Sequence, residues 1–299
     1  MTPAAVTRVL SLGGGVQSTA VALMALHQDL PAHDVAIFAD TGDEPAPVYR
    51  HVEWLARQLE ASGVQVVIAR PPTDIVSDLL RMERGGAQWA NPPLFTEGQL
   101  ARTPTPPTLP LDLPNERVLV EVNGQLRRQC TRTYKIEVIE REVSRLIGRP
   151  KGGRWPTEVA VEQVIGISWD EAQRQTVNPI AAIRNVYPLC DRRVTRADCL
   201  TWLRRHGYPE PPKSACRVCP YRSNAEWRWL REQDPEGFEH ACRVDDHIRD
   251  AGHPRGVLSR LYLHRSRTPL REVDLTAADD GQEHLMGVAA EECSGMCGA

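Results

Sequence analysis

The chain has 299 residues, of which 41% are hydrophobic, and its formal net charge is −3. This length allows one large domain or a domain with an appended lobe. The near balance of charges excludes the strongly basic footprint of a dedicated nucleic-acid-binding protein, although local arginine-rich patches are present. No signal peptide is visible and no apolar run approaches the roughly 18 residues of a membrane span. We therefore expect a cytoplasmic protein without a membrane partner, whose eight cysteines serve metal or thiol chemistry rather than disulfides.

The first 70 residues alternate between strand and helix patterns. Buried strands are expected near residues 6–10, 34–40 and 64–68, and helices over 20–30 and 47–62. The second helix has apolar residues at steps of three and four, with Pro47 in its first turn and Gly63 after its end. Strands that alternate with helices predict an α/β fold with a parallel sheet flanked by helices.

A glycine-rich turn, Ser-Leu-Gly-Gly-Gly-Val-Gln-Ser, occupies residues 11–18 between the first strand and the first helix. Glycines let the backbone approach a phosphate closely, and the N–H groups and dipole of a helix start favour an anion. The turn lacks the lysine of a Walker loop, and Ser18 stands where a dinucleotide fingerprint has its third glycine. An ordinary glycine-rich turn is the structural alternative. Because ligands of parallel sheets bind at the carboxyl ends of strands, this turn and Asp40-Thr41-Gly42 predict an anion site.

The remaining chain is less regular. Prolines between about 85 and 124 rule out a regular helix, so we predict a long loop or insertion there. A helix is expected near 133–147, a strand over 163–167, short helices after about 183, and charged helices over 224–250. These patterns predict a nucleotide-binding domain over 1–190, a mostly helical lobe over 191–288 and a flexible tail over 289–299.

Cys216 and Cys219 form a C-x-x-C pair, a spacing that presents two thiolates to one metal or cluster. Cys130 lies among cationic residues, which favour the thiolate. A fourth ligand could be a tail cysteine, or one of three cysteines whose apolar surroundings are also typical of buried structural thiols: Cys190, Cys199 and Cys242. A zinc site completed by a histidine, such as His206 or His240, is the alternative.

Four segments together resemble the sulfonucleotide (PAPS/APS) reductase group of the adenine-nucleotide alpha-hydrolase, or PP-loop, superfamily over about residues 5–220. They are the turn at 11–18, Asp40-Thr41-Gly42, Gly166-Ile167-Ser168-Trp169-Asp170-Glu171 with Arg174, and Tyr187-Pro188-Leu189 followed by Thr195–Cys199. The resemblance implies a Rossmann-like PP-loop fold. It also implies that nucleotide is bound by Ser11, Gly13, Gly14, Gly15, Gln17, Ser18, Asp40, Thr41, Gly42, Gly166, Asp170 and Arg174. The cysteine spacing is similar to the family's iron–sulfur pattern, which implies a 4Fe–4S cluster on Cys130, Cys216 and Cys219, with the fourth iron either held by a further ligand or left open.

Departures from the family pattern favour one branch of it. Gln17 replaces the aspartate of the ATP-cleaving S-G-G-x-D-S loop, Ser168 replaces an arginine, and Cys130 stands alone where APS reductases have two adjacent cysteines. The glycine triplet is retained, whereas sulfonucleotide reductases have lost their glycine pair. The leading hypothesis is therefore ATP-dependent adenylation, with Mg²⁺, followed by cluster-dependent sulfur transfer from a sulfur-donor partner.

Two other functions stay open. A PAPS or APS reductase would use Cys293 or Cys297, because the tail around them partly resembles the reductase tail, and a thioredoxin-like partner would release sulfite. A zinc-stabilised nucleotide-binding module without turnover is the third hypothesis. The acceptor is also open, and DNA or tRNA is among the candidates: Arg132 and Lys135 could bind phosphate, and Trp227 and Trp229 could stack on bases, unless Trp227 packs against Leu230.

Overall fold

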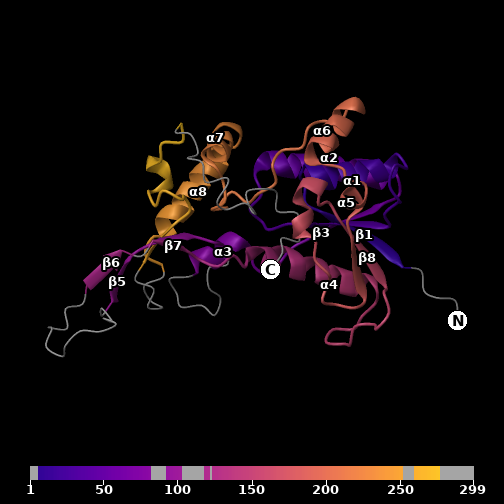
Figure 1. The fold of residues 1–299 in the computed structure, drawn as a ribbon, viewed down its shortest axis with the longest axis horizontal. Helices are drawn as coiled ribbons and strands as arrows, with labels where there is room; N and C mark the ends of the chain where they lie inside the picture. Colours follow the sequence, from indigo (N-terminus) through magenta and orange to yellow (C-terminus); the bar gives the residue numbers. More distant parts are fainter. Residues whose placement is uncertain (1–5, 82–91, 103–117, 122, 252–258, 277–299) are drawn as a thin grey trace, which may run out of the picture.

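The computed structural model describes residues 6–81, 92–102, 118–121, 123–251 and 259–276. Its centre is a parallel sheet of five strands in the order β3-β2-β1-β8-β9 (Figure 1). The strands are β1 (Thr7–Leu12), β2 (Val35–Ala39), β3 (Gln65–Ala69), β8 (Val161–Ile165) and β9 (Ile183–Val186). The predicted α/β fold with a parallel sheet is confirmed.

Helices cover both faces of this sheet (Figure 1). One face packs against α1 (Val16–Leu26), α2 (Ala46–Ala61) and α6 (Arg196–Arg205), which share a buried apolar cluster with β1 and β2. The opposite face packs against α4 (Glu137–Leu146), whose Val138, Ile139 and Val143 contact the other side of the same strands. The π-helical turn Arg132–Ile136 leads into α4, and the short helix α5 (Pro188–Asp191) precedes α6.

Three elements differ from the predictions. The first helix begins at Val16, directly after the glycines, and it ends at Leu26 because Gln28 has a positive φ of 65°. The strand expected over 163–167 ends at Ile165, so that Gly166 lies beyond it. The expectation of only short helices after 183 is wrong, since Ile183–Val186 pairs with β8 as the fifth strand.

The second lobe is assembled from distant segments. Its helices are α3 (Ile75–Leu80), α7 (Asn224–Gln233) and α8 (Pro235–Ile248), followed by the 3-10 turn Leu270–Glu272. The antiparallel strands β4 (Phe95–Glu97), β7 (Gly124–Gln125) and β10 (Arg260–Tyr262) form one small sheet, and β5 (Gln99–Arg102) pairs with β6 (Val118–Glu121). The region expected as a long loop therefore contains four short strands. One apolar cluster unites α3, α7, α8 and Leu94. Among the described helices, none is both long and apolar enough to cross a membrane.

Candidate nucleotide and thiol site

The glycine turn ends at the start of α1 without a capping side chain. Gly15 occupies the N-cap position in an extended conformation, and the first turn of the helix has no acidic residue. Gly14 has a φ of +75°, and a Cβ there would lie 3.0 Å from Val52 Cγ2 on α2. Only glycine fits this left-handed position without strain. The turn is thus pressed under α2, and the helix dipole places a partial positive charge at the start of α1.

Gly166 forms the opposite wall of the site. It follows β8, the neighbour of β1, and a Cβ at this position would lie 2.8 Å from the Ser18 backbone nitrogen. The strand order changes direction between β1 and β8, because β2 and β3 lie on one side of β1 while β8 and β9 lie on the other. Such a switch point is where open α/β sheets bind ligands.

Gln17 connects these two walls. Its buried amide nitrogen donates to Glu171 Oε2 at 3.1 Å and to Ser168 Oγ at 3.3 Å, and Glu171 pairs with Arg174. The carboxylate only accepts hydrogen bonds, so the amide orientation is fixed. Gln17 Oε1 is then buried without a hydrogen-bond partner.

Two other predicted residues of this region have contacts of a structural kind. Ser11, on β1, accepts a 2.8 Å hydrogen bond from Gln163. Asp170 is exposed, and its carboxylate accepts the backbone N–H of Arg196 at the start of α6. The buried Glu171, rather than Asp170, therefore faces the glycine turn.

The Asp40-Thr41-Gly42 turn at the end of β2 is held rigidly. Asp40 is buried and accepts hydrogen bonds from Tyr49 at 2.8 Å, Arg70 at 2.9 Å and the Gly42 backbone at 2.9 Å. Burial, together with the hydrogen bond to Asp40, raises the pKa of Tyr49. Gly42 has a φ of +80°, and a Cβ would lie 2.8 Å from Asp74 Cβ, which explains the glycine.

Asp43, one residue further, clamps the C-x-x-C segment. Its carboxylate accepts the Arg217 side chain at 2.9 Å and the Val218 backbone N–H at 3.0 Å, and its carbonyl accepts the Arg217 backbone N–H at 2.7 Å. The two residues between the cysteines are thereby fixed to the end of β2. Asp43 has no local sequence signal, because its role depends on a contact with a segment 174 residues away.

The cysteine pair lies against the same turn. The Cys219 N–H donates to the Cys216 carbonyl at 3.0 Å, and Cys216 Sγ lies 3.2 Å from Thr41 Oγ1. Glu44 Oε1 is 3.9 Å from Cys216 Sγ and 3.5 Å from Lys135 Nζ. The Asp40-Thr41-Gly42 turn and two of the predicted metal ligands, Cys216 and Cys219, therefore adjoin.

The segment that carries Cys130 also reaches this site. Lys135 contacts Glu44, and the Arg128 guanidinium lies 5.5 Å from the centre of the Tyr221 ring. Even so, no three histidine, cysteine, aspartate or glutamate side chains of the described chain are gathered tightly enough to hold a metal. A cluster on all three cysteines would need Cys130 to approach the other two.

Of the remaining cysteines, three are buried and two lie outside the residues that the structure describes. Cys190, Cys199 and Cys242 are buried. Burial raises the pKa of Cys190, and it raises the pKa of Cys242 to about 11. Cys293 and Cys297 lie outside the described residues, as does the whole predicted tail.

The candidate zinc-ligand histidines are separated. His206 stacks on Trp202, with ring centres 3.9 Å apart, whereas His240 Nε2 lies 3.4 Å from Asp43 Oδ1 beside the cysteine pair. Trp227 is fully buried in the same cluster as Leu230, so the packing interpretation of Trp227 is correct.

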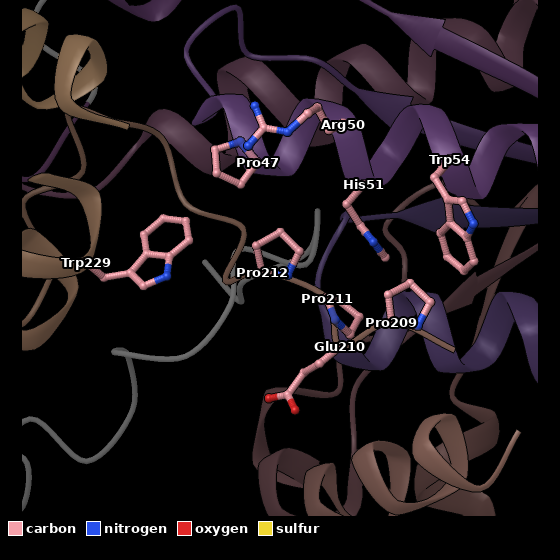
Figure 2. Close-up of a pocket in the computed structure, with 9 residues that line it drawn as sticks. All are labelled: Pro47, Arg50, His51, Trp54, Pro209, Glu210, Pro211, Pro212 and Trp229. Carbon is pink, nitrogen blue, oxygen red and sulfur yellow. The ribbon is translucent and has the colours of Figure 1, made fainter. Parts of the chain in front are cut away.

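A groove of about 480 Å³ runs along another face of α2 (Figure 2). His51 and Trp54 contribute to one side and Trp229 to the other, with the Pro209–Pro212 segment between them. Val48 and Val52 of the same helix instead face Gly14. The groove is thus distinct from the glycine turn, although His51 hydrogen-bonds Thr19 of α1 at 2.9 Å.

No protein-family model matches the chain, and no curated protein matches it either.

Proposed function

We propose that this chain is a PP-loop enzyme that binds ATP and adenylates a substrate, which then receives sulfur. The observation that carries the proposal is the start of α1, which has no side-chain cap and lies at the switch point of the sheet. There Gly14 packs under α2 and Gly166 packs against the backbone of Ser18, so that a glycine is needed at both positions. The loop residues 13–18, Gly166 and the Asp40-Thr41-Gly42 turn border this position.

The chemistry of the first step follows from the charges at this position. A substrate oxygen attacks the α-phosphorus, the bond to the bridging oxygen breaks, and pyrophosphate leaves with its negative charge. Backbone N–H groups at the helix start stabilise that charge without reorganising. The buried Glu171–Arg174 pair beside Gln17 is neutral overall, so Mg²⁺ accompanying the triphosphate would supply the positive charge.

The cysteine pair adjoins the nucleotide turn through Thr41. A 4Fe–4S cluster on Cys130, Cys216 and Cys219 would leave one iron open to hold a sulfur atom for transfer. The types of ligand and the cationic surroundings suit such a cluster. In this proposal Asp43 fixes the distance between the thiols and the nucleotide.

Two glycine variants test the nucleotide site. Gly14→Ala and Gly63→Ala both place a side chain at a positive φ, +75° and +84°, but a Cβ at Gly63 meets nothing within 4 Å. Gly63→Ala should lose stability on the order of 1 kcal/mol for its positive φ, and Gly14→Ala should lose more because its Cβ also meets Val52. We expect calorimetry to show at least tenfold weaker ATP binding for Gly14→Ala and unchanged binding for Gly63→Ala.

With an acceptor present, the products should be AMP and pyrophosphate. Equal ATP affinity for both variants would contradict the loop assignment. Tight binding of PAPS or APS without binding of ATP would favour the reductase.

Metal analysis tests the thiol site. Protein purified without oxygen should contain iron and inorganic sulfide, and Cys216→Ala should lose both. Cys199→Ala, which removes a buried thiol of α6, should retain them. Stoichiometric zinc without iron would contradict the cluster and favour the zinc-stabilised module.

A further inference from the structure

Arg222 is a buried cation directly beside the cysteine pair. Its side chain donates to the Ala215 carbonyl at 2.5 Å and to the Cys216 carbonyl at 3.1 Å from Nη2 and 3.3 Å from Nε. The residue is 1% exposed, and its guanidinium lies 5.7 Å from the centre of the buried Trp227 ring. Neutral carbonyls and an aromatic ring therefore surround this charge.

Several other charges around the cysteines are paired. Arg217 pairs with Asp43, which also has His240 beside it, and Lys135 pairs with Glu44. Among the described residues no carboxylate pairs with Arg222, so one positive charge is left over. Burying an unpaired charge costs several kcal/mol, and proteins retain such a charge where an anion compensates it.

We propose that Arg222 is a positioning residue and counter-charge for the anionic three-thiolate centre of the proposed thiol site, on Cys130, Cys216 and Cys219. Its carbonyl acceptors belong to Cys216 and the residue before it, so it fixes the turn that directs the thiols. Metal–thiolate centres with three or four cysteines carry a net negative charge, which Arg222 would balance. A neutral dithiol or a disulfide would leave the cation without a partner. This inference rests on the proposed thiol site, though not on ATP binding.

Two substitutions separate charge from shape. Arg222→Lys keeps the positive charge, whereas Arg222→Gln removes it and keeps an N–H donor for the carbonyls. Full-length protein is stripped of metal under argon and titrated with Co²⁺ against a competing chelator, and the thiolate-to-cobalt absorption is followed. We expect Arg222→Lys to bind within severalfold of wild type and Arg222→Gln to bind about 10–100-fold more weakly.

Urea unfolding of the metal-free proteins supplies the second measurement. If residue 222 balances the charge of a metal–thiolate centre, its positive charge is buried without a partner when the metal is absent. Arg222→Gln, which lacks that charge, should therefore be at least as stable as Arg222→Lys in the metal-free state. Equal Co²⁺ affinity of wild type and Arg222→Gln would overturn the inference. So would a metal-free Arg222→Gln that is less stable than Arg222→Lys. If wild type takes up no Co²⁺ at the cysteines, the inference and the thiol site both fail, while the glycine test of ATP binding is unaffected.

Discussion

His33 and His51 are imidazoles buried in the half of the chain that carries the parallel sheet, with exposed fractions of 5% and 7%. Burial lowers the pKa of each to about 4. In the unfolded chain both would titrate near 6.5, so between pH 6.5 and 4 the unfolded state binds more protons than the folded state. The contribution of the two neutral histidines to the free energy of unfolding is therefore fully present above pH 6.5. It declines as the pH falls toward 4, by about 1.4 kcal/mol per pH unit for each histidine.

His51→Gln tests this pH dependence. Glutamine can still exchange a hydrogen bond with Thr19, the partner of His51, but it does not titrate. Urea unfolding at several pH values gives the free energy of unfolding as a function of pH. Between pH 4 and 6.5, its slope for His51→Gln should be lower than that of wild type by about 1.4 kcal/mol per pH unit. Identical slopes would mean that His51 is protonated in the folded protein.

At the scale of elements, Asp234 joins the two lobes by capping two helices. One carboxylate oxygen accepts the backbone N–H of Ala46, the first residue of α2, at 3.0 Å. The other accepts the N–H of Gly237 in the first turn of α8 at 3.2 Å. Since α2 presses on Gly14, this single side chain links the second lobe to the helix that covers the glycine turn.

Asp234→Ala should accordingly cost about 2 kcal/mol, twice the typical value for one cap of about 1 kcal/mol. The comparison is Thr195→Ala, because Thr195 caps α6 alone. Chemical denaturation of both variants measures the difference. A loss for Asp234→Ala no larger than that for Thr195→Ala would show that one of the two hydrogen bonds contributes nothing.

At the scale of the whole molecule, elements with local signals were predictable. The second helix was found because its apolar periodicity is complete and Gly63 adopts a φ of +84° at its end. β9 was missed because Ile-Arg-Asn-Val has too few apolar residues to indicate a strand, and only its pairing with β8 makes it one. The strand β4 likewise depends on β10, which lies far along the chain.

The residues of the candidate site also divide into those with a local sequence signal and those without one. The glycine turn and the C-x-x-C pair are contiguous motifs, so the sequence located both. Asp43, Glu171 and Arg222 carry no such local signal, since each acquires its role from a contact or a burial that only the folded chain creates. The structure also shows that the C-x-x-C pair adjoins the Asp40-Thr41-Gly42 turn, through Cys216 and Thr41, which their spacing did not predict.

The order of the strands has a consequence for synthesis on the ribosome. The chain completes β1, β2 and β3 within its first 69 residues and then leaves the sheet until Val161. A nascent chain therefore carries the glycine turn long before Gly166 can pack against Ser18 and before residues 217 and 218 can bind Asp43. Contacts so distant in sequence form late, because closing their loops costs entropy first. A ligand that requires both walls can stabilise the finished protein, but it has nothing to bind while the first half of the chain is folding.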